Sequence, residues 1–178
     1  MIVEEKTINS DRIYTGKTIS LKVDTVEVDN RGYQKREIIE HQGAVAIVAI
    51  TDLNEIVLIK QFRKAVEKTI WEIPAGKLEN GETPKECAER ELREETGYSA
   101  ENIKLIKKFF TTPGFSNQKI YMYLATDLSI GECDFDIDES IETYKIDIEK
   151  AYDMVMNNEI EDAKTIIGIL SAKNLINK

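Results

Sequence analysis

The hydrophobic and polar positions of this chain change their period along its length, and each change marks an expected element. Residues 18–28 alternate apolar and polar side chains, which is the period of a strand with one buried face. The turn signal Asp29-Asn30-Arg31-Gly32 follows, and residues 33–40 are predicted to form the returning strand. We therefore expect a small N-terminal antiparallel β meander over residues 1–40.

The pattern is different after Gly43. Residues 44–51 form a continuous apolar run, which is typical of a strand that is buried on both faces. Further strands are expected at residues 56–61, 69–73, 103–110, 119–124 and 141–146, and helices at residues 84–96, 148–156 and 161–175. Strands interleaved with helices predict a mixed α/β domain over residues 41–178.

The helix at residues 84–96 has the clearest boundary signals. Thr83 is a residue type that caps helix N-termini, Pro84 suits the first turn, and Gly97 suits a left-handed exit. On this helix Glu91, Glu94 and Glu95 stand three and four residues apart, so their carboxylates share one side.

Like charges on one helix side are unfavourable unless a cation lies among them. Oxygen ligands of this kind suit Mg²⁺ or Mn²⁺, with water completing the coordination shell. Arg90 is placed to pair with one of the carboxylates, and Gly76 and Gly81 allow the preceding loop to fold back toward the helix. The alternative from the residues alone is a solvated helix face held by salt bridges.

The composition of the chain argues against several classes of catalytic and binding site. The chain has 178 residues, a net charge of −9, one histidine and two cysteines. A single histidine, His41, does not build a zinc site, and no GxSxG elbow accompanies it. Cys87 and Cys133 form no CxxC pair and are expected to be reduced thiols. The acidic surface disfavours nucleic acid as a partner.

No run of eighteen apolar residues is present, so no membrane span is expected. The first residues lack the basic start and apolar stretch of a signal peptide. We expect a cytoplasmic protein.

The segment from Gly76 to Tyr98 carries a fixed set of residues at fixed spacing. The set comprises Gly76, Glu82, Arg90, Glu91, Glu94, Glu95 and Gly97, with apolar Leu92 and Tyr98. This arrangement matches the Nudix box, and the chain is identified as a member of the Nudix hydrolase family. The flanking stretches Gln61-Phe62-Arg63, Trp71 to Gly76, Thr112 to Ser116 and Asp162 to Thr165 resemble the ADP-ribose pyrophosphatase branch of that family.

The resemblance implies a Nudix fold, in which a mixed sheet lies between helices, and a metal site. It implies that Glu91 and Glu95 bind Mg²⁺ or Mn²⁺ with assistance from Glu94, and that the backbone oxygen of Ala75 is a further ligand. Substrate contacts are implied for Arg36, Arg63, Glu79 and Gly114, the two arginines with phosphates or the terminal ribose. Surface salt bridges are the alternative for both arginines, and core or interface packing is the alternative to base stacking for Trp71.

Relatives carry a glutamate that positions the attacking water on a loop that corresponds to residues 134–140. Glu139 matches it best, Asp136 and Asp138 are its acidic neighbours, and Glu94 is the alternative base. The alternative for the loop is a solvated acidic stretch. Two departures from the branch pattern are Gln118, where many relatives have glutamate, and Gln42, where proline is often seen.

The implied reaction is Mg²⁺-dependent hydrolysis of ADP-ribose to AMP and ribose 5-phosphate. The alternatives are another nucleoside diphosphate sugar such as GDP-mannose, a broad housecleaning activity, or a Nudix-like sensor that binds ADP-ribose without cleaving it. The partner is a small nucleotide sugar rather than nucleic acid or membrane. The resemblance also implies a homodimer in which the meander of residues 1–40 is exchanged between subunits.

Overall fold

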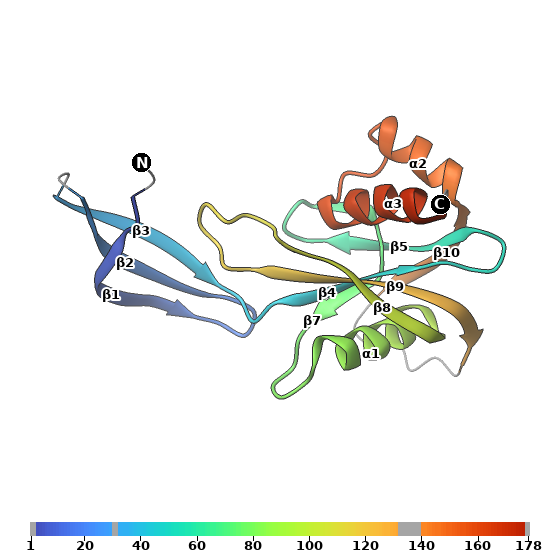
Figure 1. The fold of residues 1–178 in the computed structure, drawn as a ribbon, viewed down its shortest axis with the longest axis horizontal. Helices are drawn as coiled ribbons and strands as arrows, with labels where there is room; N and C mark the ends of the chain where they lie inside the picture. Colours follow the sequence, from blue (N-terminus) through green and yellow to red (C-terminus); the bar gives the residue numbers. More distant parts are fainter. Residues whose placement is uncertain (1–2, 30–31, 132–139, 177–178) are drawn as a thin grey trace. The chain divides into compact units, whose positions relative to one another are not determined.

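The computed structural model describes residues 3–29, 32–131 and 140–176, and it shows an α/β protein (Figure 1). The elements in chain order are β1 (Lys6–Thr15), β2 (Ser20–Val28), β3 (Gly32–Glu40), β4 (Ala44–Ala49), β5 (Glu55–Arg63), β6 (Lys68–Glu72), β7 (Ala75–Lys77), α1 (Pro84–Thr96), β8 (Tyr98–Phe110), β9 (Lys119–Ile130), β10 (Ile141–Asp147), α2 (Ile148–Met156) and α3 (Ala163–Ile176). They divide into two compact units.

The first unit comprises residues 1–43 and 109–120. Its antiparallel sheet has the order β1-β2-β3, and the hairpin between β2 and β3 closes at the pair Val28 and Gly32, where Gly32 takes a φ of +78°. The two strands predicted from residues 18–40 are therefore present. Strand β1 was not predicted as a separate strand because all its side chains are exposed and its sequence carries no apolar period.

Residues 109–120 join this unit through the end of β3. The Ile39 amide donates to the carbonyl of Phe115 at 2.8 Å, and the Asn117 amide donates to the carbonyl of Ile39 at 3.2 Å. The backbone amide of His41 donates to the Asn117 side chain at 2.8 Å. These long-range bonds attach a loop to the meander, and no local sequence pattern indicates such an attachment.

The second unit comprises residues 44–108 and 121–178, with two sheets of order β7-β4-β9-β8 and β10-β5-β6. Strand β4 is buried along its whole length, as its apolar sequence predicts. Val45, Ile47 and Ala49 share a core with α1, whereas Val48 faces α3. A β-carbon on Gly168 of α3 would lie 3.1 Å from Val48, so the glycine permits a close approach. Helix α1 covers one side of this unit and α2 and α3 the other (Figure 1).

Helix α1 begins and ends where the sequence predicts. The Thr83 hydroxyl accepts from the Glu86 amide, and the Glu86 carboxylate accepts from the Thr83 amide at 2.8 Å, which forms a capping box. At the other end Gly97 takes a φ of +73°, and its amide donates to the carbonyl of Arg93. The helix that carries the acidic cluster is thus fixed by local sequence at both ends.

Several predicted boundaries are wrong by a few residues. Strand β8 begins at Tyr98 rather than residue 103, β9 continues to Ile130 rather than residue 124, and β7 was not predicted. β7 has three residues and forms by pairing with β4, so it has no period of its own. In the part of the chain that the structure describes, no helix is long and apolar enough to cross a membrane.

Candidate active site

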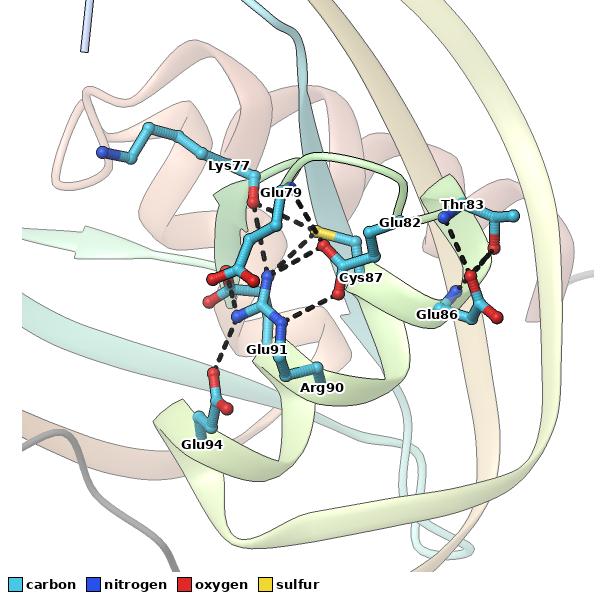
Figure 2. Close-up of polar contacts among 9 residues, drawn as sticks. All are labelled: Lys77, Glu79, Glu82, Thr83, Glu86, Cys87, Arg90, Glu91 and Glu94. Carbon is cyan, nitrogen blue, oxygen red and sulfur yellow. Dashed lines mark hydrogen bonds and ion pairs between the residues drawn. The ribbon is translucent and has the colours of Figure 1, made fainter. Parts of the chain in front are cut away.

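The carboxylates of Glu82, Glu91 and Glu94 surround the guanidinium of Arg90 in α1 (Figure 2). Its Nε donates to Glu82 at 2.9 Å, and its Nη1 donates to both Glu91 and Glu94 at 2.8 Å. Arg90 therefore pairs with carboxylates, as its position in the sequence indicates. Because one nitrogen atom contacts both Glu91 and Glu94, these two carboxylates lie close together.

The pairing of Glu82 with Arg90 keeps both of these groups ionised. Hydrogen bonds from Arg90 lower the pKa of Glu82 to about 2, and the same pairing raises the pKa of Arg90. A single guanidinium thus faces the carboxylates of Glu82, Glu91 and Glu94. The excess of negative charge favours the binding of a cation.

Gly76 supplies the space for the carboxylate of Glu91. A β-carbon on residue 76 would stand 1.8 Å from Cδ and Oε1 of Glu91, far inside any real contact distance. The side chain of Glu91 thus lies directly on the backbone of β7. Glycine is required here for close approach.

Glu95 reaches the same stretch of β7 from the next turn of α1. It is 5% exposed, and its Oε2 accepts a hydrogen bond from the Ala75 amide at 2.8 Å. Its backbone carbonyl accepts from the hydroxyl of Thr143 in β10 at 3.3 Å. The structure therefore brings Ala75, Glu91 and Glu95 together, with Glu94 joined to Glu91 through Arg90.

The donor set fits a hard divalent cation. Carboxylate and carbonyl oxygens are the ligands that Mg²⁺ and Mn²⁺ prefer, and two carboxylates lie against the adjacent residues Ala75 and Gly76 of β7. Among the residues described, no group of three or more His, Cys, Asp or Glu side chains is already disposed to hold a metal ion. Arg90 contacts one oxygen of Glu91 and one oxygen of Glu94, so a bound cation would share these carboxylates with Arg90.

Cys87 lies behind the cluster and remains a thiol. Burial and the nearby Glu82 raise its pKa to about 12, and its Sγ donates to the carbonyl of Lys77 at 3.3 Å. The side chain is buried and forms no disulfide. Cys87 is thus a reduced core residue, as expected; Cys133 lies outside the described residues.

A second charged cluster lies at the ends of β5 and β6. Arg63 donates from Nε to one oxygen of Glu72 at 2.6 Å and from Nη2 to the other at 2.9 Å, and Lys164 also binds Glu72. Burial acts to raise the pKa of Glu72, but the hydrogen bond from Arg63 and the charge of Lys164 outweigh it, so the pKa is lowered. Glu72 is 1% exposed, so the carboxylate of this pair is buried, whereas the side chain of Arg63 is 38% exposed.

The start of α3 holds Lys164 in place. Lys164 lies 3.1 Å from Asp162, and Asp162 accepts from the hydroxyl of Thr165 at 2.6 Å. That hydroxyl in turn accepts from the Ile73 amide at 2.9 Å. The roles of Glu72 and Lys164 were not predicted. The available signal was a glutamate flanked in sequence by the apolar residues Trp71 and Ile73, since a buried acid needs a partner.

Other predicted site residues are placed as follows. Glu79 is exposed. Its backbone amide donates to the carboxylate of Glu82 at 3.1 Å, and its carbonyl accepts from the Glu82 amide at 3.2 Å. In the first unit Arg36 donates from Nε to Glu5 at 2.9 Å, and Gly114 lies in an exposed turn with open space around its α-carbon. Glu139 lies outside the described residues, as do Asp136 and Asp138.

The remaining sequence features have structural partners. Gln118 accepts from the Thr111 hydroxyl at 2.9 Å, which supports the turn that contains Gly114. Trp71 packs edge-to-face on Tyr144 with ring centroids 4.9 Å apart, and the Lys60 ammonium lies 4.3 Å from its ring centre. These contacts favour packing over base stacking for Trp71.

Comparison with known proteins places this geometry in a family. Residues 40–166 match the family model of the NUDIX domain. The chain is 47% identical over 169 residues to an ADP-ribose pyrophosphatase of Bacillus subtilis (strain 168), covering 94% of this chain and 91% of the relative. It is 44% identical to a methanol dehydrogenase activator of Bacillus methanolicus, covering 94% and 92%. A crystal structure of an ADP compounds hydrolase has a TM-score of 0.86 at 21% identity, covering 98% of this chain and 95% of that one, which shows a shared fold.

Proposed function

The chain belongs to the Nudix hydrolase family, and we propose that it hydrolyses the pyrophosphate of ADP-ribose to AMP and ribose 5-phosphate with Mg²⁺ as its cofactor. Water attacks one phosphorus atom, and the bond from that phosphorus to the bridging oxygen breaks. The second phosphate leaves with the electron pair of the broken bond. The 47% identity to an ADP-ribose pyrophosphatase over most of both chains supports this choice of substrate.

The observation that carries the proposal is the convergence of Glu91 and Glu95 on Ala75 and Gly76. The Glu91 carboxylate lies on Gly76, and Glu95 accepts from the Ala75 amide. A helix that merely exposes charge to water does not need its carboxylates against the backbone of a strand. We assign Glu91, Glu95 and the Ala75 carbonyl as ligands, with Glu94 assisting.

Each residue then has a distinct task. When bound, Mg²⁺ polarises the phosphorus–oxygen bonds and screens the charge of the leaving phosphate. Arg90 holds Glu91 and Glu94 in position through hydrogen bonds of 2.8 Å. Arg63, oriented by Glu72, binds phosphate or the terminal ribose, and Arg36, Glu79 and Gly114 complete the substrate contacts. Glu139 positions or deprotonates the attacking water, with Glu94 as the alternative base.

Incubation of the protein with ADP-ribose and Mg²⁺, followed by separation of the nucleotides, tests the proposal. We expect AMP and ribose 5-phosphate in equal amounts. Binding of ADP-ribose without product would instead identify a sensor. A parallel series with GDP-mannose and other nucleoside diphosphate sugars, detected through the released phosphomonoester, establishes the base and sugar preference. Faster turnover of GDP-mannose than of ADP-ribose would overturn the substrate assignment.

We further propose that the protein acts as a homodimer in which residues 1–40 cross to the second subunit. Strand β1 exposes Ile8, Ile13 and Tyr14 to about half of their full area. A three-stranded sheet with one such edge gains stability when a partner covers it. A cytoplasmic location remains a prediction from the sequence, which cell fractionation tests.

A further inference from the structure

Gln61 of β5 has a feature that the assigned site residues do not explain. Its side chain is buried, with 8% exposure, and its Oε1 has no hydrogen-bond partner among the described residues. A buried carbonyl oxygen without a donor costs free energy in the unliganded protein. Such an atom is able to accept a hydrogen bond from a bound ligand.

The register of the sheet places Gln61 within the second charged cluster. Arg63 and Gln61 are two residues apart and share one face of β5. Arg63 pairs in register with Lys68, whereas its carboxylate partner Glu72 pairs with Ile59. The Arg63 side chain must therefore run back along the sheet to meet Glu72, and it passes the Gln61–Ile70 pair.

The same face of the sheet leads to the carboxylates of α1. Thr143 of β10 pairs with Ile59, and its hydroxyl donates to the backbone carbonyl of Glu95 at 3.3 Å. Ile141, the next residue of β10 on this face, pairs with Gln61. Gln61 thus lies one register step from the strand pair that contacts the end of α1.

The neighbour of Gln61 narrows the class of donor. Arg63, which the proposed function assigns to the phosphates or the terminal ribose, stands two residues from Gln61 on the same face of β5, so this part of the substrate is the candidate to meet Oε1. An ionised phosphate accepts hydrogen bonds and has no proton to donate to Oε1 of Gln61. A hydroxyl group attached close to the phosphate supplies the missing donor.

We propose that Oε1 of Gln61 accepts a hydrogen bond from a hydroxyl group of the sugar that is joined to the pyrophosphate, and that Gln61 thereby helps to select a nucleotide sugar over a simpler diphosphate. The proposal rests on the proposed function, because it adds a specificity contact to that substrate. A water molecule held by the pyrophosphate or its cation offers the same O–H donor, so the test must separate the two sources.

The variant Gln61→Met keeps the length of the side chain and removes the acceptor. Without ligand it should melt at or above the temperature of the wild type, because it removes an unsatisfied buried oxygen. With ADP-ribose its KM should rise about 2- to 10-fold, which corresponds to one neutral hydrogen bond, with kcat unchanged. With the methyl ester of ADP, which has the pyrophosphate but no second sugar, its KM should equal that of the wild type.

Each other outcome overturns the inference. An unchanged KM for ADP-ribose shows that Gln61 makes no contact with substrate. An equal rise for both compounds assigns the donor to water or to the pyrophosphate. A clear fall in melting temperature without ligand shows a structural role. If the wild type leaves ADP-ribose intact, the proposed function fails, and the comparison is made with the nucleoside diphosphate sugar that it does cleave. If it cleaves none, both proposals fail.

Discussion

The carboxylate of Glu91 lies where the β-carbon of any larger residue at position 76 would stand, since a β-carbon on Gly76 would be 1.8 Å from it. The variant Gly76→Ala should therefore push Glu91 out of place. We expect kcat/KM to fall about 10²-fold, the order of magnitude for a misplaced catalytic group. Gly131→Ala is the control, because its new β-carbon lies 3.8 Å from its neighbours. Full activity of Gly76→Ala would show that the position of Glu91 is irrelevant.

The dependence of activity on Mg²⁺ concentration should distinguish Glu95, a proposed metal ligand, from the carboxylates of α1 that bind no metal. Chelation should abolish activity, and excess Mg²⁺ should restore it. In Glu95→Gln the amide oxygen still accepts from Ala75, so the fold is kept while a ligand charge is lost. The Mg²⁺ concentration for half-maximal activity should rise about 10- to 100-fold. Glu89→Gln, an exposed position on the same helix, serves as the control. A normal Mg²⁺ response in Glu95→Gln would make Glu95 a structural acid.

The pair of Glu82 and Arg90 makes stability depend on pH in a defined window. Arg90 lowers the pKa of Glu82 from 4.5 to about 2 in the folded protein. The stabilisation is therefore complete above pH 4.5 and is lost as the pH falls toward 2. Glu82→Gln should be less stable at neutral pH and should lose part of this dependence. Denaturant titrations from pH 2 to 7 measure it, with Glu101→Gln as an exposed control. Parallel curves for Glu82→Gln and wild type would contradict the assignment.

Glu139 is expected to act on the attacking water. Glu139→Gln should lower kcat by about 10²- to 10⁴-fold, the usual range for general acid–base catalysis. KM should change much less, because the lost interaction is made mainly in the transition state. Asp136→Asn and Asp138→Asn should resemble the wild type. A damaged Asp138→Asn beside a healthy Glu139→Gln would shift the assignment by one residue, and three healthy variants would leave Glu94 as the base.

The homodimer is tested by light scattering, where we expect the mass of two chains. Removal of residues 1–40 should abolish both the dimer and the activity. Because that truncation removes a whole sheet, a milder variant is also needed. Ile13→Lys should weaken the dimer, whereas Leu53→Lys, at an exposed turn of the second unit, should not. A monomer with full activity would refute the exchange of the meander.

The capped helix and the buried strand β4 were predictable because their signals are local. Thr83, Pro84 and Gly97 set the bounds of α1 through contacts within a few residues, and the spacing of Glu91 and Glu95 follows from helix geometry. These features, with the Nudix box that contains them, were sufficient to predict the family, the reaction class and the fold.

Tertiary structure alone decided how the site residues meet. Strand β7 exists because β4 pairs with it, and this pairing brings Gly76 under the carboxylate of Glu91. The partners Arg63, Glu72 and Lys164 come from three separate elements, and 92 residues separate Glu72 from Lys164. Gln61 is a further example: the sequence predicts a glutamine in a strand, but only the packed sheet shows that its side-chain oxygen is buried without a donor among the described residues. Such contacts depend on sheet register and helix approach, which are properties of the whole fold and leave no period in the local sequence.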